Sequence, residues 1–151
     1  MRVIACAVVQ PSIPMLKPVV ALVAWTFVMW GWMYVTRIPA IRRSGMKLDP
    51  TAPRGEQMAS LPAQVRWKAD NYNHLFEQPT LFYAVTIVLA LVSRATETDA
   101  MLAWTYVGLR AAHSVFQATV NVIEVRFALF FVSSLVLAAM TARAALAVWP
   151  A

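Results

Sequence analysis

The feature that most constrains this chain is a run of 19 residues, Pro18–Thr36, that contains no charged side chain. An α-helix rises about 1.5 Å per residue and needs about 20 apolar residues to cross the hydrocarbon core of a bilayer. Lys17 and Arg37 flank the run, so its charged boundaries are spaced as those of a membrane span. The run therefore predicts a transmembrane helix over residues 18–36.

The rest of the chain repeats this pattern. Hydrophobic residues make up 60% of the 151 residues and charged residues 13%, against about 45–50% and about 25% in a soluble domain. This composition excludes an ordinary soluble enzyme, a disordered chain and a nucleic-acid-binding module. The apolar stretches are continuous, which favours helices over the alternating strands of a membrane barrel. We expect one all-α membrane domain over residues 1–151, a four-helix bundle with spans near residues 18–36, 71–93, 100–123 and 127–149.

Basic residues predict the orientation of these spans. The chain has 13 Lys and Arg against 7 Asp and Glu, a net charge of +6, and most of this excess lies in the predicted loop 37–68. Excess Lys and Arg mark the cytoplasmic side of a membrane. We therefore expect loop 37–68 in the cytoplasm and both termini on the other side. Residues 61–73 are expected to be helical and to extend the second span into the cytoplasm. The predicted spans indicate an integral, multi-pass membrane protein, and the general character of the sequence is typical of a bacterial inner-membrane protein.

The single cysteine and the two histidines exclude several kinds of site. One cysteine, Cys6, allows neither a disulfide framework nor a cysteine-ligated metal site. No hydrophobic region of about 7–15 residues precedes it, so lipidation after a signal peptide is not expected. His74 and His113 offer two metal ligands with one nearby carboxylate, and we expect no metal site.

Polar side chains on the second and third predicted spans mark the candidate site, because a charge kept inside a bilayer costs at least about 2.5–3.5 kcal/mol. Helical spacing puts one group on a single face of the second span: Asp70, Asn73, His74 and Glu77. The same spacing puts a second group on one face of the third span: Tyr106, Arg110, His113, Gln117 and Asn121. We expect these two seams to face each other and open toward the cytoplasm, with Arg126 at the mouth. Pro79 predicts a kink beside the first seam.

The seams suit a small polar anion. Arg110 and Arg126 would bind carboxylates or a thiolate, and Glu77 an amine. Asn73 and Gln117 would bind amide groups. The alternative is that Glu77 and Arg110 pair inside the bundle and hold the helices together.

Two stretches on these spans resemble a known family. Asp70–Tyr83 (DNYNHLFEQPTLFY) resembles the second helix of MAPEG proteins, the membrane-associated proteins of eicosanoid and glutathione metabolism, among them microsomal glutathione S-transferase. Ala103–Ser114 (AWTYVGLRAAHS) resembles the third helix, and Arg37–Ala40 is similar to the segment after the first helix in the bacterial branch. The resemblance covers about residues 15–149.

What this resemblance implies is a homotrimer that binds glutathione, as co-substrate, between neighbouring subunits near the cytoplasmic face. An arginine in the family stabilises the glutathione thiolate, and Arg126 stands at the matching junction of the third and fourth helices. The second helix of the family reads Arg-x-x-x-Asn-x-x-Glu. Here Asn73 matches the asparagine, Ala69 stands where the arginine is expected, and Glu77 follows Asn73 by four residues. Arg66, one turn earlier, is the candidate substitute for the arginine.

The chain is therefore predicted to be a glutathione-dependent membrane transferase or peroxidase that acts on lipophilic electrophiles or lipid hydroperoxides. Arg126 and Tyr106 are the predicted catalytic residues. The predicted glutathione-binding residues are Arg66, Asn73, Glu77, Arg110, His113 and Gln117. The expected partners are further copies of the chain, membrane lipids and a lipophilic substrate. The alternative is a non-catalytic membrane scaffold or lipid-binding subunit of the same fold, in which the polar seams are assembly contacts.

Overall fold

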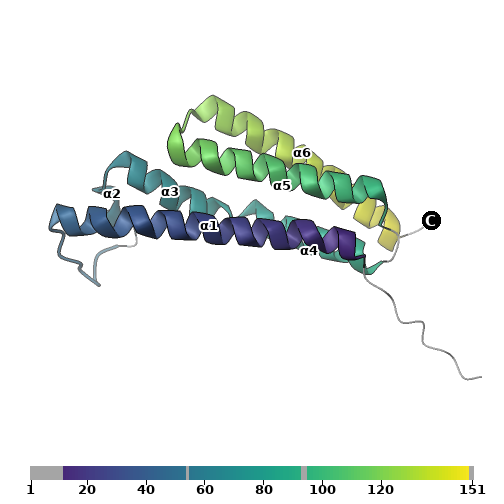
Figure 1. Cartoon of the computed structure of the whole chain (residues 1–151), viewed down its shortest axis with the longest axis horizontal. Coiled ribbons are helices and arrows are strands. Elements are labelled where there is room, and N and C mark those ends of the chain that lie inside the picture. The colour runs from purple at the N-terminus through teal and green to yellow at the C-terminus, as the bar shows by residue number, and fades with distance from the viewer. Residues whose placement is uncertain (1–11, 54, 93–94, 150–151) are drawn as a thin grey trace, which may run out of the picture.

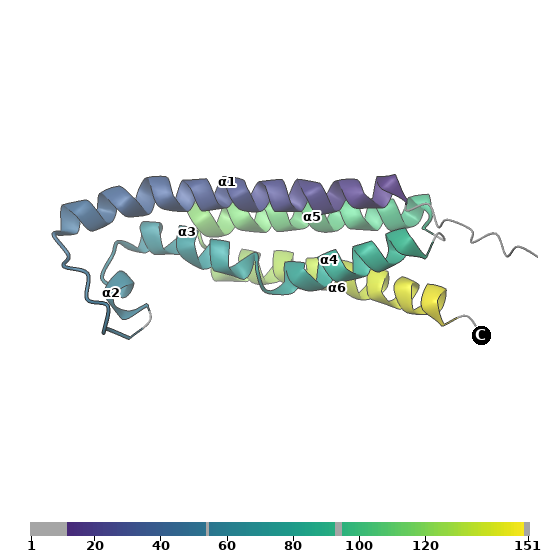
Figure 2. The same ribbon diagram turned by 90° about the horizontal axis from the view of Figure 1, so that it is seen from below.

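A computed structural model describes residues 12–53, 55–92 and 95–149, so Cys6 lies outside the described residues. Every regular element in these ranges is a helix, which confirms the all-α prediction. The long helices lie side by side in an elongated arrangement, and the short α2 lies near the C-terminal end of α1 (Figures 1 and 2). The elements are α1 (Ile13–Ser44), α2 (Glu56–Ala59), α3 (Ala63–His74), α4 (Gln78–Leu91), α5 (Glu97–Thr119) and α6 (Ile123–Val148).

Three segments of the described chain are long and apolar enough to cross a membrane: Ile13–Ser44, Ala63–Leu91 and Ile123–Val148. This is therefore a membrane protein. The helix α5 is not among the three, since Arg110, His113 and Gln117 lower its hydropathy. That α5 also crosses the membrane, which would bring the number of spans to four, stays a prediction. The span boundaries 100–123 and 127–149 stay predictions as well.

The helix α1 extends beyond the predicted span 18–36 at both ends. It stops at Ser44 because Gly45 takes the left-handed conformation, with a φ of 63°, and its N–H bonds to the carbonyl of Arg42. Glycine adopts this conformation without steric cost. The predicted loop 37–68 is thus helical at its start, within α1, and at its end, within α3. The helix at its end, α3, agrees with the helix predicted over residues 61–73. The helix at its start was not predicted, because a charge marks the edge of a membrane span and not the end of a helix.

The predicted second span, 71–93, is interrupted. The helix α3 ends at His74 and α4 begins at Gln78, and the chain between them forms the bend visible in Figure 2. Pro79 lies in the first turn of α4, where it has no N–H to donate to the carbonyl of Leu75. The kink that Pro79 predicts is therefore a complete break over residues 75–77.

An ion pair joins α5 to α6 at the end of the molecule that holds the α4–α5 turn. Thr96 caps α5, and its N–H donates to the carboxylate of Asp99 at 2.7 Å. Arg143 of α6 donates to the same carboxylate, which is 2% exposed. The Arg143 hydrogen bond, with those from Thr96, lowers the pKa of Asp99 to about 2 from its usual 3.8.

We expect acid to weaken this contact between α5 and α6. Because the pKa of Asp99 is lowered in the folded state, its carboxylate stabilises the fold above its unfolded-state pKa, and this stabilisation is lost as the pH falls from about 4 to about 2. The shift corresponds to roughly 2 kcal/mol in the free energy of unfolding. Thermal unfolding followed by circular dichroism across this pH range measures it. Asp99→Asn should be less stable at neutral pH and should lack this component of the acid dependence, and an unchanged acid profile in that variant would contradict the assignment.

Candidate functional site

The helix α5 presents its predicted polar residues on one buried face. Tyr106, Arg110, His113 and Gln117 are each at most 3% exposed, and their spacing of three or four residues places them along one stripe. Asn121 lies just beyond the end of α5 in a left-handed conformation, with a φ of 57°. The third-span seam therefore lies in the interior.

A chain of hydrogen bonds holds Arg110 and crosses from α5 through α4 to α6. The Nε of Arg110 donates to the Tyr106 hydroxyl at 3.2 Å, and this hydroxyl donates to Oε1 of Gln78 at 3.3 Å. The Nε2 of Gln78 then donates to the Ser134 hydroxyl at 2.6 Å, which donates to the carbonyl of Phe130 at 2.8 Å. Gln78 was not predicted, and its only sequence signal is a polar side chain beside Pro79.

The guanidinium of Arg110 has no carboxylate partner among the described residues. Its Nη1 and Nη2 are buried and bond to none of the atoms of residues 12–53, 55–92 and 95–149, while its Cζ lies 5.3 Å from the centre of the Phe130 ring. A buried, unpaired cation is costly unless another group compensates its charge. Glu77 does not do so, because it is 66% exposed and bonds to Nδ1 of His74 at 2.6 Å. Arg110 thus keeps two buried donors without a protein partner among the described residues.

The expected seam on the second span is not formed. The helix α3 ends before Glu77, and Asp70, Asn73 and Glu77 are exposed. Asn71 is instead fully buried, with neither atom of its amide bonded. The break over residues 75–77 takes Glu77 out of the helical phase of α3, whereas Asp70 and Asn73 are exposed because α3 turns the face that carries Asn71 and Ala69 toward the interior.

Two predicted site residues meet at a cavity of about 370 Å³, which we call the Arg126 cavity. It is lined by His74 of α3, His113 of α5 and four residues of α6: Ile123, Arg126, Phe127 and Phe130. The rings of His74 and His113 have centroids 5.1 Å apart. The Nη1 of Arg126 donates to Oδ1 of Asn121 at 2.7 Å, and its buried Nε has no partner within the described part of the chain.

Two other predicted residues lie at a separate hollow of about 220 Å³ between α1, α2 and α3, which we call the Arg66 hollow. Arg66 and Asn73 line it together with Asp70 and Arg37. Arg37 was not predicted as a site residue, although its place directly after the first uncharged run was a usable signal. The predicted binding residues are thus divided between the α1 side and the α5–α6 side of α3.

Tyr106 does not line either space. Its side chain is fully buried, and its ring stacks on Phe82 with centroids 4.5 Å apart. Gln117 is also buried, with its Oε1 unbonded. Both therefore lie in the protein interior and line neither space.

Comparison with known proteins gives one match. A family model described as the MAPEG family matches residues 15–146, nearly the whole chain. No curated protein and no solved structure matches the chain significantly.

Proposed function

This chain belongs to the MAPEG family, and from that premise we propose that it is a glutathione-dependent membrane transferase or peroxidase. Its second substrate would be a lipophilic electrophile or a lipid hydroperoxide that arrives from the bilayer. The observation that carries the proposal is the Arg126 cavity, with Arg110 buried behind its Phe130 wall. Arg110 and Arg126 both keep donors without protein partners, and a peptide with carboxylates and a thiol is the kind of ligand that uses such donors.

We also propose that α1, the α3–α4 pair, α5 and α6 form a four-span bundle that assembles as a homotrimer. The division of the basic residues supports this assembly. One protomer has Arg37 and Arg66 between α1 and α3, and it has Arg126 between α3, α5 and α6. A neighbouring copy that brings its Arg66 hollow to the Arg126 cavity would complete one glutathione site from two incomplete ones.

In the proposed mechanism Arg126 stabilises the thiolate, which is the reactive form of the thiol. Asn121 holds the guanidinium through Nη1, so Nε remains for the sulfur. The thiolate sulfur then bonds to the electrophilic carbon, and the leaving group departs with the electron pair of its bond to that carbon. With a hydroperoxide the sulfur bonds to the terminal oxygen as the O–O bond breaks, the alkoxide takes a proton from water to give the alcohol, and a second glutathione thiol converts the sulfenic acid to the disulfide with loss of water. Tyr106 bonds to Nε of Arg110 away from the cavity, so we assign it a positioning role in place of a catalytic one.

The remaining predicted residues would bind the tripeptide. Arg66 and Asn73 are exposed at the Arg66 hollow and would bind its polar groups from the neighbouring protomer. His113 lines the Arg126 cavity. Glu77 is exposed and bonded to His74, and it would bind an amine. Gln117 has an unbonded, buried Oε1 and would act with Arg110.

The proposed orientation places the basic end of α1 in the cytoplasm of a bacterium, with the protein in the inner membrane and both termini outside the cytoplasm. Arg42 and Arg43 are exposed in the last turn of α1, as expected for a helix end that leaves the membrane on its positively charged side. The loop 37–68 and both basic sites would then be reached from the cytoplasm, where glutathione would be available.

The experiment that tests the function is a titration of the detergent-purified protein with glutathione, followed by the ultraviolet absorbance of the thiolate. We expect a saturable signal, because fixed positive charge favours the thiolate over the thiol. S-methylglutathione has no ionisable thiol and should give no signal while competing for the site. A well-folded oligomer without any thiolate signal would contradict the proposal and favour the non-catalytic scaffold.

A further inference from the structure

His74 and Glu77 form a hydrogen-bonded pair at the α3–α4 break, beside the Arg126 cavity. The Nδ1 of His74 lies 2.6 Å from Oε2 of Glu77. His74 lines the Arg126 cavity, whereas Glu77 is not among its lining residues. The carboxylate therefore holds the imidazole from outside the cavity that the ring lines.

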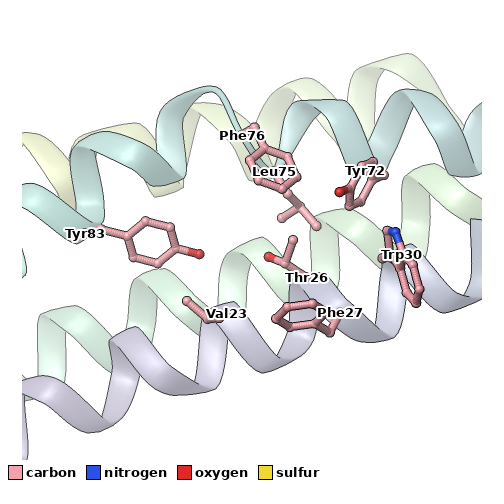
Figure 3. Close-up of a pocket in the computed structure, with 8 residues that line it drawn as sticks. All are labelled: Val23, Thr26, Phe27, Trp30, Tyr72, Leu75, Phe76 and Tyr83. Carbon is pink, nitrogen blue, oxygen red and sulfur yellow. The ribbon is translucent and has the colours of Figure 1, made fainter.

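The opposite side of the break is apolar. Leu75 is 4% exposed and points toward α1, and together with Phe76 it lines a groove of about 270 Å³ between α1 and the break (Figure 3). None of the side chains that line this groove is charged. The pair of His74 and Glu77 thus brings the ionisable groups of the break to the side of the Arg126 cavity.

Packing fixes the position of the His74 ring. Its centroid lies 5.1 Å from that of His113 on α5 and 5.5 Å from that of Phe130 on α6. The side chain of His74 is 22% exposed, against 66% for that of Glu77. An ion pair between two mobile surface side chains contributes little, but here one partner is packed against two other helices.

Backbone hydrogen bonds hold Glu77, although its side chain is exposed. Its N–H donates to the carbonyl of His74 at 3.4 Å. Its own carbonyl accepts hydrogen bonds from the N–H of Thr80 at 3.2 Å and from the Thr80 hydroxyl at 2.6 Å. The turn that interrupts the helix therefore presents the carboxylate to Nδ1 of His74.

The carboxylate of Glu77 selects one tautomer of His74. An ionised carboxylate only accepts hydrogen bonds, so the proton between the two groups belongs to Nδ1. In the neutral ring Nε2 then keeps its lone pair. A carboxylate in this position orients an imidazole and stabilises the imidazolium that forms when Nε2 takes a proton. This is the arrangement of a general base.

Three further ionisable groups face the His74 ring: His113 and Arg110 of α5, and Arg126 of α6. The two guanidinium groups favour an anion in their vicinity. His113 is 3% exposed and pairs with no carboxylate in the ranges 12–53, 55–92 and 95–149. His74 is therefore the imidazole whose protonated form has a carboxylate to stabilise it.

We propose that His74 is the base that takes the proton of the glutathione thiol, and that Glu77 is a positioning residue that holds His74 for this step. The inference rests on the proposed glutathione-dependent function. It adds an acceptor for the proton to the stabilisation of the thiolate by Arg126. Oε1 of Glu77 takes no part in the bond to His74, so it is available to the amine assigned to Glu77 above.

The proton moves within the cavity. The S–H bond breaks and leaves its electron pair on the sulfur, and the proton forms an N–H bond at Nε2 of His74. The thiolate then lies beside Arg126 and the imidazolium beside Glu77, so the transfer leaves the net charge of the cavity unchanged. After the sulfur has reacted, the imidazolium loses its proton to water.

The test counts the protons released when the detergent-purified full chain binds glutathione at a pH of about 7.5, where an imidazole of ordinary pKa, about 6.5, is mostly neutral. A pH indicator in weakly buffered solution measures the protons, and ultraviolet absorbance measures the thiolate in the same sample. If Arg126 acted alone, each thiolate formed would release one proton to the solution. We expect a release close to zero, because His74 keeps the proton. S-methylglutathione, which has no ionisable thiol, gives the proton change caused by the rest of the tripeptide, and this value is subtracted.

Two variants should restore the release of protons. His74→Gln removes the base while Arg126 still stabilises the thiolate, so the release should rise to about one proton per thiolate formed. Glu77→Gln removes the charge that stabilises the imidazolium and should also raise the release, and its exposed position keeps the test available if His74→Gln does not fold. Glu124→Gln is the matched control, because it replaces an exposed carboxylate of α6 that does not line the cavity, and it should leave the count unchanged.

The outcomes separate this inference from the function on which it rests. A thiolate signal accompanied by about one released proton in the unchanged protein would overturn the role of His74 and leave the proposed function standing. A release near zero that neither His74→Gln nor Glu77→Gln changes would show that another group keeps the proton, and would overturn the role as well. The absence of any thiolate signal would overturn both the function and the inference.

Discussion

Arg126→Ala is expected to remove the thiolate absorbance of added glutathione while the oligomer keeps its size and helicity. A positive charge a few ångströms from a thiol favours the thiolate by about 1.4–4 kcal/mol, so its removal should lower the thiolate fraction at neutral pH by about tenfold or more. Arg126 is only partly buried and its side chain is bonded to Asn121 alone, so its truncation leaves the helix packing in place. Absorbance titration and size-exclusion chromatography of the same samples measure both effects.

Two variants separate charge from shape and from general basicity. Arg126→Lys keeps the positive charge without the planar guanidinium and should retain part of the signal. Arg42→Ala removes an exposed arginine at the end of α1, away from both basic sites, and should leave the signal unchanged. If Arg126→Ala keeps the full thiolate signal, the role assigned to Arg126 is wrong.

Arg110→Met should weaken glutathione binding strongly without weakening the fold. Truncating one partner of a buried charge interaction costs about 2–5 kcal/mol of binding free energy, which corresponds to an increase in Kd of about thirtyfold or more. In the ligand-free protein the same change removes a buried cation that lacks a carboxylate partner. Replacement of a buried charge by an apolar side chain of similar size is often neutral or stabilising. Isothermal titration calorimetry with glutathione measures the change in Kd. A thermal unfolding curve without glutathione measures the change in unfolding temperature.

The sign of the stability change distinguishes the two functions considered for this chain. If Arg110 served only to hold the helices together, Arg110→Met would lower the unfolding temperature and reduce the amount of oligomer. Glu77→Gln is the matched variant, because the pairing of Glu77 with Arg110 was the structural alternative. Glu77 is exposed and bonded to His74, so we expect Glu77→Gln to leave assembly intact. Loss of the oligomer in both variants would favour the scaffold function.

The parts of the fold that were predictable depend on local patterns. The uncharged run 18–36 lies within α1, and the spacing of Tyr106, Arg110, His113 and Gln117 placed them on one buried stripe of α5. Both inferences need only the helical period and the cost of charge in lipid. The structure confirms that α5 buries this stripe. The burial was predictable because neither inference depends on the detailed packing of the neighbouring helices.

Two of the missed features, the exposure of Glu77 and the contacts of Gln78, depend on the interruption between α3 and α4. A continuous helix through Pro79 would place Glu77 on the face of Asn73, but the break ends that phase at His74. Proline in a sequence is compatible with a kink or with a full break, and the packing of α3 and α4 against different neighbours decides between them. The same interruption brings Gln78 into contact with Tyr106 and Ser134, which no periodic pattern would reveal.

Because α1 is uninterrupted, the number of residues that precede Arg37 in this helix determines on which side of the helix Arg37 lies. The chain runs as one helix from Ile13 to Ser44, and Arg37 of its outer part lines the Arg66 hollow. One residue inserted or deleted between Met33 and Arg37 would turn the arginine by about 100° around the helix axis, because each turn contains about 3.6 residues. No loop between the lipid-embedded part and Arg37 absorbs such a change. This helix should therefore accept substitutions at many lipid-facing positions and yet tolerate almost no insertion or deletion before Arg37.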